Sequence, residues 1–225
     1  MSPNPRIALI HALEESVIPA RQAFAEEWPE ARIFDLMDTS LAVDHAERGK
    51  LDDVMVDRFL TLGRYASGTR GSGATAEGIL FTCSAFGAAI DAVKRDRTIP
   101  VFRPNEAAFA EAVQAGGTIA VVVSFRPSLA TLMDKLRTAA REAGASIEPT
   151  GVVVEAALPA LKAGRGEEHD RLIAEAAAKC KGIDTFVLGQ FSLARAKPAV
   201  AQATGARVIT TPHSAVRALK RTISG

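Results

Sequence analysis

Apolar residues along this chain gather in short runs that lack strict alternation with polar residues. Such runs stand at residues 7–10, 79–81, 119–123, 186–188 and 208–209. Strands that are buried on both faces of a parallel sheet have this pattern. The spacing of apolar positions between the runs predicts helices at residues 19–27, 51–65, 106–114, 128–143 and 167–181. Strands that alternate with helices predict an α/β fold with doubly wound parallel sheets.

The strand-like segments occur twice, in the same order. Residues 6–13 resemble residues 118–125, residues 78–87 resemble residues 185–194, and residues 99–107 resemble residues 207–215. The copies are separated by roughly half of the chain. The sequence therefore predicts two pseudo-symmetric α/β domains with the active site in the cleft between them. We expect residues 1–106 and 208–225 to form the first half, and residues 107–207 to form the second.

The two halves differ at one strand end, where the first has Cys83 and the second has Gln190. Ligands of open α/β sheets bind beyond the carboxyl ends of the strands. That rule selects His11, Asp38, Thr82, Cys83, Ser84, Asn105, Ser124, Gln190, Ser192, Thr211 and His213. Amide N–H groups at the start of a helix after Cys83 would lower the thiol pKa and bind an anion. We expect a reactive thiolate there, with a buried structural cysteine as the alternative.

Charge and composition argue against several classes of partner. The chain has 27 Lys and Arg against 26 Asp and Glu, so no strong field favours nucleic acid. No apolar run approaches the roughly 20 residues of a membrane-spanning helix, and no signal-peptide pattern is present. We expect a cytoplasmic protein without a nucleic-acid or membrane partner. In that compartment Cys83 and Cys180 are expected to be free thiols.

Two apparent cofactor or metal signals are weak. The string formed by Gly71, Gly73 and Ala76 follows a predicted helix rather than a strand, so we expect residues 63–78 to be a flexible connector and not a dinucleotide site. The histidines lack metal-ligand spacing. We therefore expect no cofactor and no metal. His45 and His169 lie in charged stretches and are expected to be solvated.

The strand-end motifs at residues 81–87 (FTCSAFG) and 188–194 (LGQFSLA) together resemble the aspartate/glutamate/hydantoin racemase superfamily, which includes maleate isomerase and arylmalonate decarboxylase. The likeness extends from residues 7–11 through residues 104–107 to residues 211–215. It implies two pseudo-symmetric α/β halves around a small carboxylate substrate, no cofactor, and two cysteines that face opposite sides of one carbon. It also allows a homodimer.

By this resemblance, Cys83 is the catalytic acid/base of a racemase or isomerase that acts at the α-carbon of a small carboxylic or amino acid. The resemblance and the strand-end rule together assign substrate binding to His11, Thr82, Ser84, Ala85, Phe86, Asn105, Ser124, Gln190, Ser192 and His213. The amides of Ala85 and Phe86 would bind the anion. Phe86, Phe125 and Phe191 could admit an apolar substituent.

Gln190 departs from the family pattern because it stands where a second catalytic cysteine is expected. A carboxamide does not exchange a proton near neutral pH. His11 or His213 could act on the second face, or Cys83 could attack covalently. A lyase of the arylmalonate decarboxylase type would need only one thiol. A non-catalytic protein that binds small acids is a further alternative.

Overall fold

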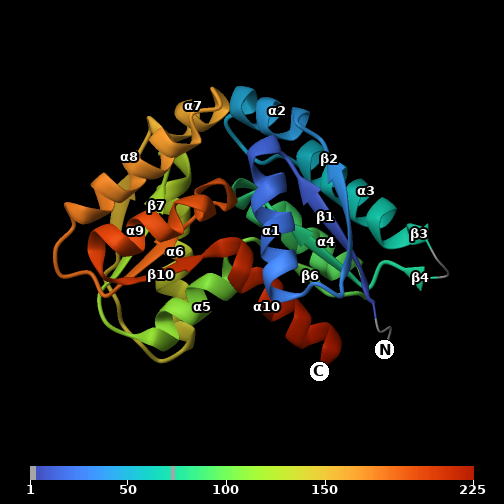
Figure 1. Cartoon of the computed structure of the whole chain (residues 1–225). Coiled ribbons are helices and arrows are strands. Elements are labelled where there is room, and N and C mark those ends of the chain that lie inside the picture. The colour runs from blue at the N-terminus through green and yellow to red at the C-terminus, as the bar shows by residue number, and fades with distance from the viewer. Residues whose placement is uncertain (1–3, 72–73) are drawn as a thin grey trace. The chain divides into compact units, whose positions relative to one another are not determined.

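The computed structural model describes residues 4–71 and 74–225, and the chain divides into two compact units (Figure 1). Unit 1 contains Met1–Pro104 and Ala215–Gly225, and unit 2 contains Asn105–Ser214. The sequence predicts junctions after residues 106 and 207. The second junction lies further along the chain because residues 207–210 form a strand that pairs with a strand of unit 2.

Unit 1 is built on a parallel sheet with the strand order β2-β1-β5-β6. Its strands are β1 (Arg6–His11), β2 (Arg32–Met37), β5 (Gly78–Phe81) and β6 (Val101–Phe102). Its α-helices are α1 (Val17–Glu27), α2 (Ser40–Arg48), α3 (Asp53–Gly68) and α4 (Gly87–Asp96), with short 3-10 helices η1 (Glu14–Ser16) and η2 (Ser84–Phe86). Helix α10 (Thr211–Ser224) begins in unit 2 and runs on into unit 1.

Unit 2 has a parallel sheet with the strand order β8-β7-β9-β10. Its strands are β7 (Ile119–Val123), β8 (Thr150–Val153), β9 (Thr185–Leu188) and β10 (Arg207–Thr210). Its helices are α5 (Glu106–Ala115), α6 (Pro127–Glu142), α7 (Ala157–Lys162), α8 (Gly166–Ala178), η3 (Phe191–Ala196) and α9 (Lys197–Thr204). The fold class predicted from the sequence, two α/β domains with parallel sheets, is confirmed.

The registers of the two sheets match residue for residue at the central strands. Ile10 pairs with Phe81 in unit 1, and Val122 pairs with Leu188 in unit 2. Counting outward from these pairs makes Cys83 equivalent to Gln190 and Ala12 equivalent to Ser124. The outer strands β6 and β10 hold equivalent places in the two sheets. Phe102 pairs with Leu80 and Ile209 pairs with Val187, so the registers make Phe102 equivalent to Ile209. The alignment of the two sequence segments differs from this by one residue.

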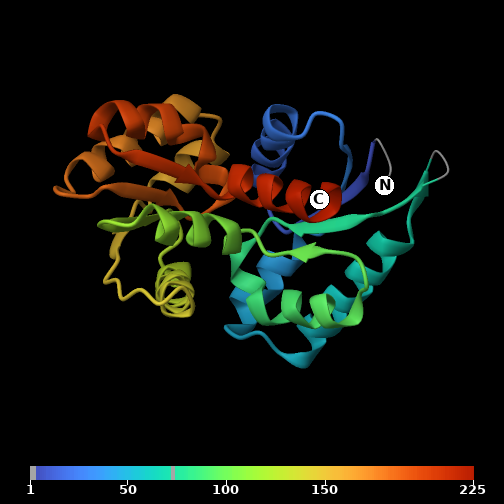
Figure 2. The ribbon, with the colours of Figure 1, turned by 90° about the horizontal axis from the view of Figure 1, so that it is seen from below.

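The glycine-rich segment is more regular than expected. Helix α3 continues through Gly68, and an antiparallel pair, β3 (Arg70–Gly71) and β4 (Ala74–Thr75), follows it. This pair extends away from the sheet of unit 1 in Figures 1 and 2. The expectation of a flexible connector from residue 63 onward is wrong for α3, because its apolar positions pack on unit 1. Gly73 of the proposed string lies outside the described residues.

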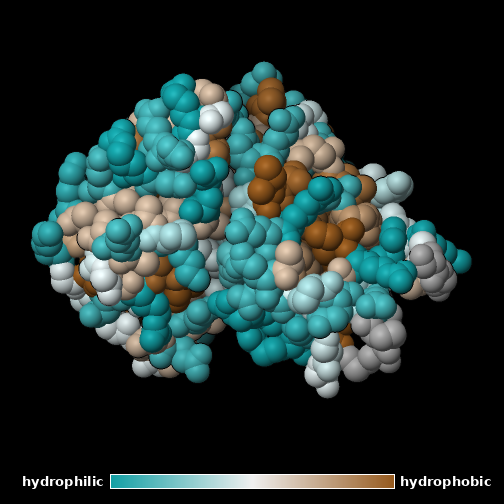
Figure 3. Space-filling view, in the orientation of Figure 1, coloured by the Kyte–Doolittle hydropathy of each residue, from teal (hydrophilic) through white to brown (hydrophobic). Residues whose placement is uncertain are grey.

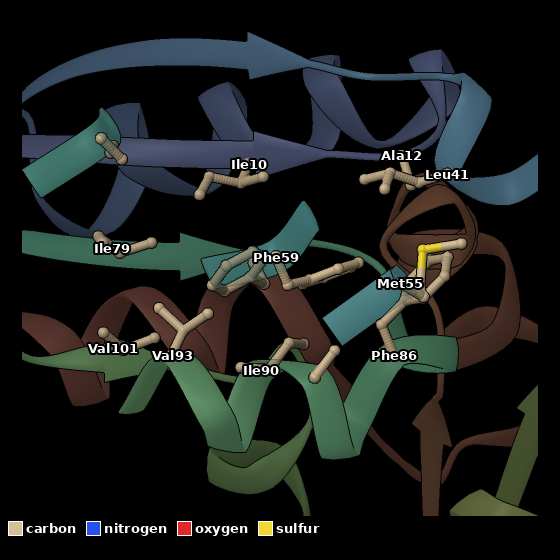
Figure 4. Packing of buried hydrophobic residues seen from close by; sticks show 14 residues of the cluster. Ile10, Ala12, Leu41, Met55, Phe59, Ile79, Phe86, Ile90, Val93 and Val101 are labelled. Carbon is tan, nitrogen blue, oxygen red and sulfur yellow. The ribbon is translucent and has the colours of Figure 1, made fainter. Parts of the chain in front are cut away.

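Aromatic rings fill the core of unit 1. Phe59 of α3 stacks on Phe81 of β5 with ring centroids 5.3 Å apart, and it lies 4.9 Å from the ring of Phe86. Figure 4 shows Phe59, Met55 and Phe86 close together between the β-sheet and α4. The three rings are almost completely buried. Because Phe86 belongs to the turn that follows Cys83, this core also supports the strand end of β5.

Helix α3 lies very close to α4 at Gly63, and this predicts a position-specific cost. A Cβ at Gly63 would clash with Cγ1 of Val93, whereas a Cβ at Gly68 would meet nothing within 4 Å. Gly63→Ala is expected to lower the free energy of unfolding by about 1–3 kcal/mol through overpacking. Gly68→Ala, on the same helix, should leave stability unchanged or raise it by up to about 1 kcal/mol. Urea unfolding of both variants tests this, and equal midpoints would contradict it.

The surface of unit 1 exposes scattered apolar side chains, visible as brown atoms over α1 and α2 in Figure 3. Ile18 is 76% exposed and Val43 is 55% exposed. Single exposed apolar residues are common on folded proteins and do not by themselves mark an interface. Within the described part of the chain, no helix is both long enough and apolar enough to span a bilayer.

Candidate functional site

Cys83 lies directly beyond the carboxyl end of β5, as the residue that precedes η2. Its backbone is extended, with φ −108° and ψ 125°, so the chain turns only after the thiol. The N–H of the preceding residue, Thr82, donates to the carbonyl of Ile10 at 3.1 Å, which ties this strand end to β1. The structure therefore brings His11, Thr82 and Cys83 to one edge of the unit 1 sheet, with Ser84, Ala85 and Phe86 in the following turn.

The Cys83 side chain is a thiol rather than a thiolate in this environment. Burial raises the pKa of Cys83, and the N–H of Ala85 opposes that effect only in part. The residue keeps part of its surface exposed while its side chain packs against the apolar core of unit 1. Our expectation of a lowered pKa is therefore wrong in direction, because removal of the sulfur from water outweighs donation by the turn amide. At neutral pH the side chain carries a proton that it can donate.

His11 is enclosed by hydrogen-bonding partners of unit 1. Its Nε2 lies 2.9 Å from Oδ1 of Asp35, and its Nδ1 lies 2.9 Å from Oγ of Ser16 and 3.0 Å from Oγ1 of Thr82. Asp35 in turn accepts from Nε of Arg21 at 2.9 Å. Because the Asp35 carboxylate can only accept, Nε2 of neutral His11 carries the hydrogen and Nδ1 is an acceptor. Asp35, His11 and Thr82 thus form a chain that ends next to Cys83.

Through these hydrogen bonds His11 supports the strand end that carries the thiol of Cys83, a role that needs no contact with a substrate. Both ring nitrogens contact protein atoms, and the residue is fully buried. Burial lowers the pKa of His11, while the hydrogen bond to Asp35 opposes the shift. A neutral, oriented imidazole accepts from a hydroxyl and so fixes the Thr82 side chain. The structure adds Ser16 and Asp35, which sequence reasoning missed, although an acidic residue within the apolar strand β2 was a usable signal.

His169 corrects a sequence-based expectation. It is fully buried, with Nδ1 2.8 Å from Oδ1 of Asp170, and Nε2 has no hydrogen-bond partner among the described residues. Its neighbours in sequence are charged, but α8 turns His169 to the face that also buries Ile173 and Ala177. His45, also expected to be solvated, is partly buried with its ring 5.1 Å from the ring of Phe86.

The buried histidines predict that stability falls on mild acidification. Burial lowers the pKa of both His11 and His169 in the folded protein below the ordinary 6.5. The unfolded chain therefore binds more protons in the window below pH 6.5, and each histidine contributes a loss of up to about 1.4 kcal/mol per pH unit until its folded pKa is reached. Urea unfolding between pH 7.5 and 5.5 measures the slope. His169→Leu should flatten it; an unchanged slope would contradict this account.

Gln190 occupies the equivalent strand end of unit 2. It follows β9 and precedes η3, with φ −133° and ψ 147°, close to the backbone conformation of Cys83. Its side-chain Oε1 accepts from the backbone N–H of Ser124 at 2.7 Å and from Oγ of Ser124 at 2.9 Å. Ser124 comes directly after β7, the strand that pairs with β9. The carboxamide is therefore held by two donors from the adjacent strand end.

The remaining strand-end groups of unit 2 are held by nearby partners. Oγ1 of Thr210 lies 2.6 Å from Nδ1 of His213, and Oγ1 of Thr211 donates to the carbonyl of Leu188 at 3.3 Å. His213 is 9% exposed, and Ser192 is partly exposed in η3. These contacts order the edge of the unit 2 sheet and orient His213 through its Nδ1.

Asn105 has a buried side-chain amide that finds no hydrogen-bonding partner among the described residues. It is 1% exposed and precedes α5 without capping it, and neither Oδ1 nor Nδ2 makes a hydrogen bond to any described residue. Buried amides are nearly always satisfied, since an unsatisfied one costs about 1–3 kcal/mol. Such a residue is a good candidate for contact with a ligand.

Other predicted positions have structural roles. Phe86 and Phe191 are buried in the cores of their units, so their rings serve packing; Phe125 is 45% exposed. Asp38 accepts from the N–H of Ser40 at 3.1 Å and from Nη2 of Arg58 at 2.7 Å, which explains its place at the start of α2. Among the described residues, no three His, Cys, Asp or Glu side chains gather as metal ligands would.

One comparison with known proteins identifies a family, and another identifies the fold. A family model described as Asp/Glu/Hydantoin racemase matches residues 21–219. Among solved structures, the aspartate racemase of Picrophilus torridus has a TM-score of 0.72 at 10% identity, covering 98% of this chain and 95% of the other. No curated protein matches.

Two further structures have the same fold. A glutamate racemase of Francisella tularensis in complex with D-glutamate has a TM-score of 0.71 at 13% identity, covering 99% of this chain and 82% of the other. The allantoin racemase of Pseudomonas fluorescens has a TM-score of 0.69 at 15% identity, covering 97% and 91%. At these identities the structural likeness establishes the fold alone.

Proposed function

The chain belongs to the Asp/Glu/hydantoin racemase family, and from this we propose that it is a cofactor-independent isomerase that acts at the α-carbon of a small carboxylic or amino acid through Cys83. The observation that carries the proposal is the position of Cys83 at the carboxyl end of β5, directly before the turn of η2. A general acid that is protonated at neutral pH can deliver a proton to carbon. The substrate class follows from the family.

The proposed chemistry is proton exchange at carbon. A base removes the proton from the α-carbon, and the electron pair moves into the carboxylate to give an enediolate. The thiol of Cys83 then returns a proton to the carbon and becomes a thiolate, or the same steps run in reverse. Charge on the enediolate oxygens must be met by fixed donors. We assign this role to Ser84 and to the turn amides of Ala85 and Phe86, whereas Thr82, whose one hydroxyl hydrogen is directed at Nδ1 of His11, positions the strand end.

Racemisation needs a second acid/base group, and we propose His11 or His213 for that role. Both nitrogens of His11 contact protein atoms, and Nδ1 of His213 contacts Oγ1 of Thr210. Histidine exchanges protons near neutral pH, which glutamine does not. Asn105 is proposed to bind the substrate, which would satisfy its buried amide.

A lyase is the second candidate, and Gln190 is the feature that favours it. A decarboxylation that ends with protonation by Cys83 breaks a carbon–carbon bond, releases CO₂ and needs one proton donor only. A strand end with a carboxamide in the place of a second thiol suits that requirement. Isomerase chemistry stays the first candidate because the family model that matches this chain is described as a racemase family.

The proposal is tested by solvent deuterium exchange. Purified protein is incubated in D₂O with aspartate, glutamate, hydantoins, maleate and substituted malonates, and NMR follows deuterium at the α-carbon. Cys83→Ser is compared with Cys180→Ser, a matched control because Cys180 follows α8 in unit 2. We expect exchange in the wild type and in Cys180→Ser, and none in Cys83→Ser.

The products separate the candidates. Deuterium in an intact carbon skeleton identifies an isomerase, and loss of CO₂ identifies a lyase. Exchange that persists without Cys83 would remove the thiol from the mechanism. Absence of exchange with every compound, together with binding of one of them, would replace catalysis by a small-acid-binding function.

A further inference from the structure

We propose that Gln190 is a fixed hydrogen-bond donor that binds an acceptor oxygen of the substrate, a carboxylate or carbonyl oxygen, in the place where a proton-transferring thiol would stand. The inference rests on the proposed function for its substrate class. The orientation itself comes from the contacts of Gln190 within unit 2.

The contacts determine which end of the carboxamide is oxygen. A backbone N–H can only donate, so the side-chain atom that lies 2.7 Å from the N–H of Ser124 must accept, and it is Oε1. The Ser124 hydroxyl reaches the same oxygen at 2.9 Å. A flipped amide would place two donors against each other. Nε2 therefore points away from Ser124, and it donates to no atom in the part of the chain that the structure describes.

Comparison with the equivalent strand ends of unit 1 indicates that the contact between Ser124 and Gln190 is specific to unit 2. Equivalence of the two sheets places Ala12 where unit 2 has Ser124, and Cys83 where unit 2 has Gln190. Alanine offers no hydroxyl, and the thiol needs none. Where the carboxamide replaces the thiol, the adjacent strand end supplies the hydroxyl that holds it. The serine and the glutamine therefore belong together as one unit of function.

A held carboxamide has defined chemistry. Its two N–H hydrogens do not ionise near neutral pH, so the group binds an oxygen acceptor without accepting or delivering a proton. Holding Oε1 in advance reduces the side-chain entropy lost when the donor binds. The group would select substrates that carry an oxygen acceptor and would reject ones with a donor in its place, because two facing donors leave both unsatisfied.

The test measures binding in the full-length Cys83→Ser protein, so that it does not depend on proton transfer. Aspartate, glutamate, hydantoin, maleate and methylmalonate are titrated, and saturation-transfer NMR gives the affinity of each. Gln190→Glu keeps an oxygen that accepts from Ser124 but replaces Nε2 by an anionic oxygen. We expect this variant to lose affinity by about tenfold or more for any compound that binds. Ser124→Ala should lose affinity less, since its backbone N–H still holds Oε1.

Gln114→Glu is the matched control, because it makes the same charge change at an exposed position of unit 2. It should bind as the parent protein does. Equal affinity of Gln190→Glu and its parent, or binding of none of the compounds to the parent, would overturn the proposal. Binding that depends on Gln190 in a protein whose wild type shows no deuterium exchange would keep this inference and reject the proposed catalysis.

Discussion

We expect Cys83→Ser to lower the turnover number by about 10²–10⁴-fold and to leave the substrate affinity nearly unchanged. The reason is that positioned acid/base groups contribute rate factors of this size. A serine hydroxyl keeps the shape of the turn but does not exchange a proton usefully near neutral pH. Steady-state kinetics on the substrate found by deuterium exchange measures the effect. Loss of affinity with unchanged turnover would instead make Cys83 a binding residue.

The pH profile distinguishes the catalytic role of the thiol from a structural one. Because burial holds the pKa of Cys83 above its ordinary value, the thiol is protonated at neutral pH. If donation by this thiol limits the rate, activity is retained at neutral pH and falls as pH rises through that raised pKa. Cys180→Ser should keep both the rate and the profile. A rate that rises with pH over the same range would identify the thiolate as the limiting base.

The fold could be read from the sequence because its signals are local. Apolar runs such as Ile119–Val123 match buried parallel strands, and the duplicated segments share their central register. Helix ends were less readable. Helix α3 continues to Gly68 although its last residues lie in a glycine-rich stretch, since packing against unit 1 outweighs the weak helix propensity of glycine.

The candidate site is predicted from the sequence as a set of strand-end residues, but the contacts among these residues are not. The strand-end rule found Ser124 and Gln190 separately, yet only the pairing of β7 with β9 brings the serine donors to the glutamine oxygen. The direction of the Cys83 pKa depends on burial, which the sequence pattern does not report. Ser16 and Asp35 were missed because their relation to His11 is made in three dimensions.

Phe59→Ala is expected to lower the free energy of unfolding by about 3–5 kcal/mol, the usual cost of removing a buried phenylalanine ring. Phe59 is 1% exposed and contacts the rings of both Phe81 and Phe86 (Figure 4). Urea unfolding measures the change. Tyr65→Ala is the control on the same helix, because Tyr65 is 63% exposed and should cost about 1 kcal/mol or less.

If Phe59→Ala does not fold, Phe59→Leu keeps the test open, since a leucine fills part of the same space and should cost less. The consequence for function follows from Phe86, which ends the short 3-10 helix after Cys83. Removing the ring that supports Phe86 loosens the turn that carries the thiol and its amide donors. Turnover should therefore fall in Phe59→Leu at temperatures where the protein is still folded, while Tyr65→Ala keeps the wild-type rate. Equal turnover in the two variants would mean that packing around Phe59 does not affect the turn that carries Cys83.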